Sequence, residues 1–70
     1  MKYIRKDRYL LNIEKCVHIR VLQYTDGRFA IVFQNENGDV YLTYENDESV
    51  DKDMERIGEF ILNEERLLKL

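Results

Sequence analysis

The chain has 70 residues, a net charge of −3 at pH 7, one cysteine and one histidine. The lone cysteine excludes an internal disulfide, and one cysteine with one histidine is too few for a structural zinc site. Because a single small domain, here residues 1–70, rarely gains more than about 3–5 kcal/mol from its core, a partner subunit is the remaining source of added stability.

Residues 2–16 predict two short strands and one helical turn. The strands are expected at residues 2–5 and 8–11 and are joined near Lys6-Asp7. Residues 12–16 then favour a helical turn, because the Asn12 side chain can accept hydrogen bonds from the following backbone N–H groups. Ile13 can tuck under the sheet from this turn.

The next three apolar runs, over residues 17–44, are separated by two glycine turns. A two-residue turn at Asp26-Gly27 would set Ile31 opposite Leu22. A three-residue loop ending at a left-handed Gly27 sets Ile31 opposite Val21 instead. We favour this loop, because it gathers the apolar residues on one face. That face holds Val17, Ile19, Val21, Phe29, Ile31, Phe33, Val40, Leu42 and Tyr44.

The second turn contains Asn37-Gly38 between β-branched and aromatic runs, which is the strongest short-range hairpin signal. A type I′ turn needs positive φ at both of its central residues, and asparagine and glycine adopt it most readily. This turn sets Phe33 opposite Leu42. A four-residue loop over residues 36–39 preserves the same register.

A helix is expected from Ser49 to Leu68, with Ser49 as its N-cap and Asp51 and Asp53 at its positive end. The helical stripe consists of Val50, Met54, Ile57, Ile61 and Leu68, with Phe60 and Leu67 beside it. A break at Asn63 would leave residues 64–70 as a second short helix. We favour a continuous helix, because Leu68 stays in phase with the stripe.

The predicted fold is therefore α+β: an antiparallel sheet of four to five strands with one C-terminal amphipathic helix packed on one face. The Tyr-Leu-Leu-Asn-Ile-Glu segment at residues 9–14, the two hairpins and the terminal helix resemble short proteins of Gram-positive bacteria and their phages whose function is not established. This resemblance implies the fold and a dimer. It implies no activity, and no functional residue is carried over.

Nothing in the sequence points to catalysis or to a cofactor. Cys16-Val17-His18 is the only cysteine–histidine pair, and no oxyanion hole or glycine-framed nucleophile turn accompanies it. The acidic run at residues 45–53 lacks the pattern of a calcium loop, and no glycine-rich phosphate loop is present. We expect a non-enzymatic protein without a catalytic residue, a cofactor or a metal site.

We expect the side of the sheet away from the helix to be a partner surface. Several apolar and aromatic residues lie together on this side, and soluble monomers rarely expose large contiguous apolar patches. The expected partner-binding residues are Arg20, Leu22, Tyr24, Val32 and Tyr41, with Ala30 among them. We expect a homodimer that acts as a protein-interaction or regulatory module. An interface along the helix through Leu62, Leu67 and Leu70 is the other route. The competing arrangement folds the N-terminal strands over this face and leaves a monomer.

Charge is divided unevenly along the chain. Residues 1–35 hold seven Lys or Arg against three Asp or Glu, whereas residues 36–70 hold four against eleven. We favour charges that interleave on the surface of one domain. The alternative function is single-stranded nucleic-acid binding. Its residues would be Arg5, Lys6, Arg8 and Arg20 on phosphates, with Tyr24 or Tyr41 stacking on bases. The pI of 5.1 and the absence of an RNA-binding signature count against it.

The sequence also predicts a cytoplasmic protein without a membrane partner. No stretch approaches the roughly 20 apolar residues of a membrane span, and no signal peptide is readable. A free cysteine fits a reducing interior.

Overall fold

The computed structural model describes residues 1–70 and contains two three-stranded sheets. In chain order the elements are β1 (Tyr3–Lys6), β2 (Tyr9–Asn12), the 3₁₀ helix η1 (Ile13–Lys15), β3 (Cys16–Gln23), β4 (Phe29–Asn35), β5 (Gly38–Tyr44), α1 (Asp47–Leu62) and β6 (Leu67–Lys69). One sheet, called the meander below, is antiparallel and has the order β3-β4-β5. The other, called the small sheet, has the order β2-β1-β6, with β1 antiparallel to β2 and parallel to β6. The predicted α+β class is confirmed, but the strands form two sheets and not one.

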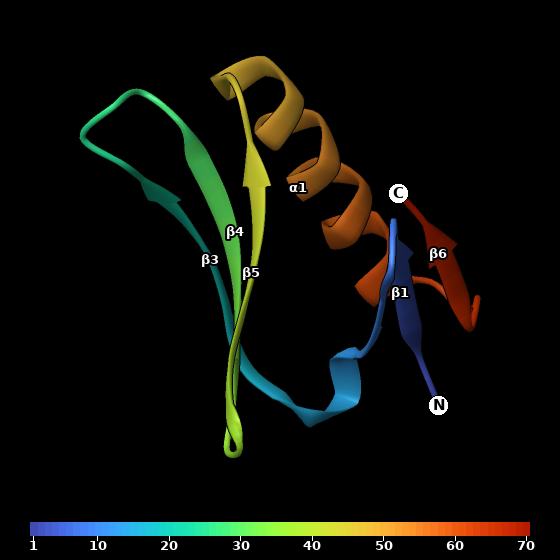
Figure 1. Ribbon diagram of the computed structural model, residues 1–70. Coiled ribbons are helices and arrows are strands. Elements are labelled where there is room, and N and C mark those ends of the chain that lie inside the picture. The colour runs from blue at the N-terminus through green and yellow to red at the C-terminus, as the bar shows by residue number, and fades with distance from the viewer.

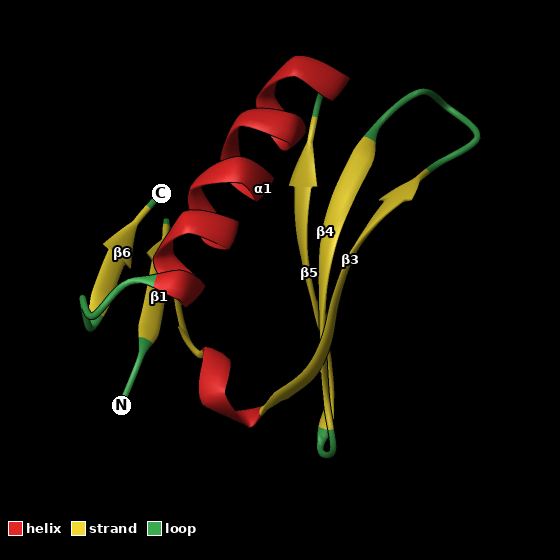
Figure 2. Ribbon diagram, turned by 180° about the vertical axis from the view of Figure 1, so that it is seen from behind, coloured by secondary structure: helices red, strands yellow, loops and turns green.

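Both the helix and the small sheet lie on the same side of the meander (Figure 1). The helix runs along the meander, and the small sheet lies beside the C-terminal part of the helix. Figure 2 shows η1 in the connection that leads from the small sheet to the meander. One core joins these elements, because Ile4 of β1 and Ile13 of η1 pack with Phe33 of β4 and Phe60 of α1. No helix of the chain is long and apolar enough to cross a membrane.

The N-terminal elements follow the prediction, with each strand shifted by one residue toward the C-terminus. The two strands are joined by a tight turn in which Asp7 has a φ of +52°. Aspartate is among the few non-glycine residues that adopt this conformation readily. The expected turn after β2 is also present: the Asn12 side chain accepts a hydrogen bond from the Glu14 backbone N–H at 3.1 Å, and Ile13 is buried.

The first loop of the meander confirms the register that the apolar pattern favours. Val21 lies opposite Ile31, and Ile19 lies opposite Phe33. Gly27 has a φ of +92°, and its backbone N–H donates to the Tyr24 carbonyl at 3.1 Å. The three-residue loop is therefore closed by a left-handed glycine, as expected.

The second turn lies one residue earlier than predicted, which shifts the strand register by two residues. Asn35 lies opposite Gly38 and Phe33 opposite Val40, so the turn residues are Glu36 and Asn37. Neither Glu36 nor Asn37 has the positive φ that both central residues of a type I′ turn need, and Gly38, which follows them, has a φ of +129°. A shift of two residues returns every side chain to the same face, so the predicted core face survives this correction.

The apolar face of the meander forms most of the core, but its β3 edge is exposed. Ile31, Phe33 and Leu42 are almost completely buried, whereas Val17 and Val21 on β3 are 66% and 41% exposed. The reason is that α1 packs against β4 and β5 and leaves the edge strand β3 uncovered.

The helix begins two residues before the predicted start and has a different cap. The Asn46 side chain, not that of Ser49, caps α1 and accepts a hydrogen bond from the Ser49 backbone N–H at 2.9 Å. The buried residues of α1 are Val50, Asp53, Ile57 and Phe60. Ile61, which the apolar spacing placed on the stripe, is 47% exposed. The inward face of the helix is thus rotated toward Phe60 and includes one carboxylate.

The predicted continuation of the helix to Leu68 is wrong, because α1 ends at Leu62 and the chain forms strand β6. The Asn63 side chain accepts a hydrogen bond from the Glu65 backbone N–H at 2.8 Å and turns the chain. The Lys2 ammonium donates to the Phe60 and Asn63 carbonyls and so supplies the positive charge at the helix C-terminus. Pairing with β1 then satisfies the backbone of the last residues, which a helix end would leave open.

Replacing the central core residue should unfold the domain. Phe33 is fully buried on β4, and Phe33→Ala should lower the free energy of unfolding by about 3–5 kcal/mol. Thermal and urea unfolding followed by circular dichroism measure this loss. Leu62→Ala is the control, because Leu62 is 89% exposed, and its effect should stay within about 0.5 kcal/mol. Equal stability of the two variants would contradict the assigned core.

Candidate functional site

The predicted partner-binding residues lie together on the outer face of the meander, which we define as its side away from α1. Arg20, Val32 and Tyr41 occupy one cross-strand row, because Val32 of β4 lies opposite Arg20 on one side and Tyr41 on the other. Leu22 follows on β3, and Tyr24 lies just beyond the end of β3, next to the Thr25–Gly27 loop. The N-terminal strands do not cover this face, since they belong to the small sheet on the helix side (Figure 1).

The centre of the outer face is less accessible than the sequence predicts. Val32 and Ala30 of the central strand β4, which lies between β3 and β5, are both fully buried. Val32 therefore offers no surface to a partner in this conformation. Tyr41 is 43% exposed, Arg20 is exposed, and Leu22 and Tyr24 are half-buried. The contact surface of the outer face consists of these residues, and not of its centre.

One end of the outer face is held in place by a local contact. The Arg28 guanidinium lies 5.5 Å from the centre of the Tyr24 ring and donates to the Asp26 carboxylate at 2.9 Å. Backbone and side-chain hydrogen bonds from Arg28 lower the pKa of Asp26 below its ordinary value. Tyr24 therefore already has a cation as its neighbour within the single chain.

The helix residues that offered a second interface lie on different parts of the molecule. Leu62 is almost fully exposed at the end of α1, and Leu67 is 45% exposed on the small sheet. Leu70 packs against the core. These three leucines share no common surface.

Three polar side chains that the sequence does not single out as a group meet inside the molecule. The Asp53 carboxylate of α1 accepts hydrogen bonds from the Lys6 ammonium of β1 at 2.7 Å and from the Tyr44 hydroxyl of β5 at 2.6 Å, both on Oδ2. The Lys6 ammonium also lies 4.1 Å from the centre of the Tyr44 ring. We call this group the Lys6–Asp53–Tyr44 cluster. Its only signal in the sequence is an acidic residue between Val50 and Ile57 on the inward side of the helix.

The ionisation of the cluster fits a structural role. Burial raises the pKa of Asp53, but the hydrogen bonds from Lys6 and Tyr44 outweigh this effect and hold it below its ordinary value. Burial and the hydrogen bond to Asp53 raise the pKa of Tyr44. At neutral pH the cluster therefore holds a carboxylate, an ammonium and a neutral phenol. None of the three residues of the cluster is among the lining residues of the three surface hollows of the molecule.

The cysteine–histidine pair is not brought together. A bulge between Cys16 and His18 shifts the register of β3, and the Cys16 side chain packs against the core while His18 lies opposite Gln34 on the outer face. Burial raises the pKa of the Cys16 thiol, which lowers its fraction of reactive thiolate. No group of three or more His, Cys, Asp or Glu side chains is arranged to hold a metal ion.

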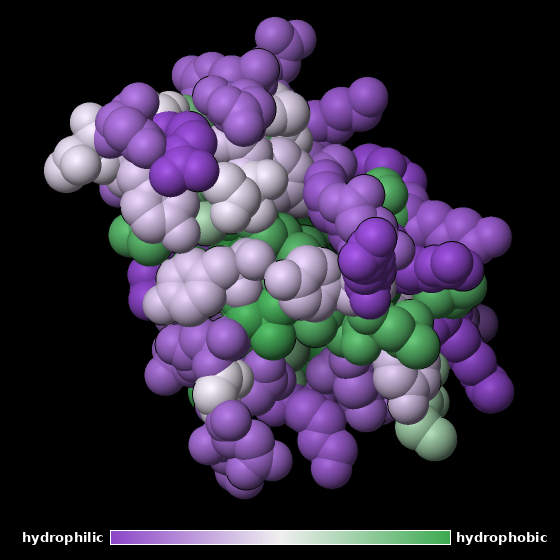
Figure 3. All heavy atoms as spheres, viewed as in Figure 1, coloured by the Kyte–Doolittle hydropathy of each residue, from purple (hydrophilic) through white to green (hydrophobic).

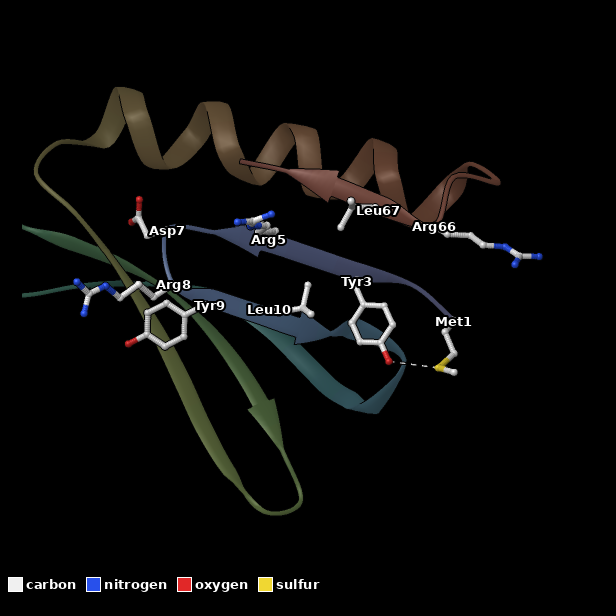
Figure 4. Close-up of a pocket in the computed structure, with 9 residues that line it drawn as sticks. All are labelled: Met1, Tyr3, Arg5, Asp7, Arg8, Tyr9, Leu10, Arg66 and Leu67. Atoms are coloured by element: carbon white, nitrogen blue, oxygen red, sulfur yellow. Dashed lines mark hydrogen bonds between the residues drawn. The ribbon is translucent and has the colours of Figure 1, made fainter.

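A second surface lies on the small sheet, where an open hollow has a volume of about 1000 Å³ (Figure 4). Its lining residues are Met1, Tyr3, Arg5, Asp7, Arg8, Tyr9, Leu10, Arg66 and Leu67.

Seen in the view of Figure 3, the molecule is largely hydrophilic, with hydrophobic side chains gathered in a band across its middle.

The residue set predicted for nucleic acid is divided by the structure. Arg5 and Arg8 line the hollow, but Lys6 is bound to Asp53, and Arg20 lies on the other sheet. Arg66 joins Arg5 and Arg8 without having been expected, because residues 64–70 carry no strand signal of their own and lie here only through pairing with β1.

Comparison of the chain with protein-family models, with curated proteins and with solved structures finds no match.

Removing the carboxylate of the cluster should destabilise the fold in a pH-dependent way. Asp53→Asn weakens two charge-assisted hydrogen bonds, and we expect a loss of about 1.5–3 kcal/mol in urea unfolding at pH 7. Because the pKa of Asp53 is lower in the folded state, its stabilisation is present above about pH 4 and is lost as the pH falls through the folded value. The difference between the two proteins should therefore shrink toward pH 2.

Asp51→Asn is the matched control, since Asp51 is exposed on the same helix. Its effect should stay within about 0.5 kcal/mol at both pH values. A loss from Asp53→Asn that is the same at pH 7 and pH 2 would show that the carboxylate is not ionised in the folded protein.

Proposed function

We propose that the protein is a small non-enzymatic protein-interaction module that acts as a homodimer through the outer face of the meander. The observation that supports this proposal is the one-sided packing of the fold. The helix and all three strands of the small sheet lie on one side of the meander, and no element of the chain covers the other side. Two tyrosines and a leucine remain there at the surface or partly exposed.

The size of the domain supports self-association. A chain of 70 residues has neither a disulfide nor a large core, and binding of a second copy stabilises the folded state by mass action. Tyrosine suits such a contact, because it buries a large ring while its hydroxyl stays hydrated. The outer face offers Tyr24 and Tyr41 on opposite edges of the sheet, and either ring can rest against a second copy.

The distribution of charge favours one arrangement of the two copies. His18 and Arg20 lie on β3, whereas Asp39 and Tyr41 lie on β5 at the same two levels. In an isologous dimer with its two-fold axis along β4, β3 of each copy faces β5 of its partner. Arg20 then meets the partner's Tyr41, and His18 meets the partner's Asp39. An axis across the strands would instead place β3 on β3 and oppose like charges.

The arginine–tyrosine contact of this arrangement is favourable on its own terms. A guanidinium over the face of a tyrosine ring is attracted by the ring quadrupole, by roughly 0.5–2 kcal/mol depending on exposure. The contact occurs twice in a symmetric dimer. Arg20 is thus compatible with the interface, provided that the axis runs along β4.

The oligomeric state of Tyr41→Asp tests the proposal. Light scattering at high micromolar concentration should give twice the 8.5 kDa of one chain for the unmutated protein, and the monomer mass for Tyr41→Asp with unchanged circular dichroism. The substitution is made at Tyr41, which is 43% exposed, because a charge at the fully buried Val32 would unfold the sheet.

Tyr9→Asp provides the matched control. Tyr9 is 48% exposed and lies on the small sheet, so this variant should remain a dimer. A monomer mass for the unmutated chain would refute the homodimer. A dimer that survives Tyr41→Asp would move the interface away from the outer face.

A further inference from the structure

We propose that the hollow on the small sheet is a binding site for single-stranded nucleic acid. This site is separate from the outer face of the meander and does not rest on self-association. It combines Arg5, Arg8 and Arg66 with Tyr3 and Tyr9 on a floor that includes Leu67. Residues from both ends of the chain contribute, which is why the sequence does not reveal the set.

The three arginines of the hollow are free to bind an anion. None of their guanidinium groups forms an ion pair or a side-chain hydrogen bond within the protein, whereas Lys2, Lys6, Arg28 and Arg56 elsewhere all have partners. Asp7 is the single carboxylate among the lining residues. The hollow is thus a cationic site on a protein whose net charge is −3. Local clusters of this kind attract anions even when the whole molecule is acidic.

The arrangement of the arginines along the sheet suits an extended polyanion. Arg8 lies at the β1–β2 turn, Arg5 lies at the middle of the surface, and Arg66 lies at the other end (Figure 4). Pairing fixes this order, because Tyr3 lies opposite Leu67 and the Tyr3 backbone N–H donates to the Arg66 carbonyl at 2.8 Å. A chain with one negative charge in each unit can contact all three.

The tyrosines distinguish nucleic acid from an acidic peptide. Tyr9 is 48% exposed, and Tyr3 is partly exposed beside Arg5 and Leu67. Sheets that bind single strands use aromatic rings for stacking on unpaired bases and cations for the phosphates. An acidic peptide would use the arginines alone. A duplex would keep its bases stacked on one another and away from the rings.

Fluorescence anisotropy with labelled oligonucleotides of about six nucleotides tests the proposal. Single-stranded RNA and single-stranded DNA form separate arms, and a duplex of the same sequence is the comparison. Binding to at least one single strand is expected, and three phosphate contacts should weaken it about 20-fold between about 50 and 200 mM salt. A strand this short can occupy only one hollow, so self-association of the protein does not affect the measured affinity.

Variants of the hollow should lower this affinity selectively. Arg5→Ala and Arg66→Ala should each weaken binding and reduce its salt dependence, whereas Tyr9→Ala should weaken binding about 5- to 150-fold through lost stacking. Lys52→Ala is the matched control, since Lys52 is an exposed cation on α1 that does not line the hollow, and the affinity of this variant should be unchanged. Circular dichroism confirms that each variant is folded.

Several outcomes would overturn the proposal. One is the absence of any anisotropy change at tens of micromolar protein for both single strands. Another is duplex binding as tight as single-strand binding. A loss of affinity from Lys52→Ala equal to that from Arg5→Ala would place the contact elsewhere. Competition by polyglutamate as effective as that by unlabelled oligonucleotide would assign the hollow to an acidic protein partner.

Discussion

The structure depends on the Asp53 carboxylate, where three elements meet. It binds Lys6 of β1 and Tyr44 of β5 from its position on α1, so it joins the small sheet, the helix and the meander at one point. A buried carboxylate is stable only when it is paired and hydrogen-bonded, and Lys6 and Tyr44 together supply the charge and the two hydrogen bonds. Lys2 adds a second link from the N-terminal segment to the end of the helix. These two lysines hold the N-terminal strands on the helix side of the molecule.

Both candidate surfaces follow from that attachment. Because β1 is held against the helix, it cannot cross to the other side of the meander, and the face that carries Tyr41 stays uncovered. The same position of β1 presents its free edge to the last residues of the chain, which pair with it as β6. This pairing brings Arg66 beside Arg5 and completes the hollow. One internal contact therefore explains both the bare face and the cationic site.

The sequence predicts the structural features that depend on residues close together along the chain. It does not predict the features that depend on contacts between distant segments. The Gly27 loop and the core face follow from local turn geometry and the alternation of apolar residues. The register of the second hairpin differs from the predicted one by two residues, because the pattern of apolar faces cannot distinguish shifts by an even number of residues. Leu68 is in phase with the apolar stripe of the helix, yet it lies in strand β6. Its strand conformation depends on backbone pairing with β1, which the local sequence around Leu68 does not reveal. From the sequence, Asp53 is expected only to interact favourably with the N-terminus of the helix. Its actual partners, Lys6 and Tyr44, lie 47 and 9 residues away along the chain.

The structure shows where the unevenly distributed charges of the sequence lie in the fold. Among the cations of the N-terminal half, Lys2 and Lys6 bind groups of the helix, whereas Arg5 and Arg8 remain free on the small sheet. Asp53 is the one acidic residue drawn into the core. The outer face and the hollow belong to different sheets and share no residue, so occupation of one leaves the other open. A dimer formed through the outer face would carry two hollows, and a strand long enough to reach both would bind the second at a high effective concentration. Self-association would in that case raise the avidity for a long strand without adding any contact to the strand, although each interaction rests on its own residues.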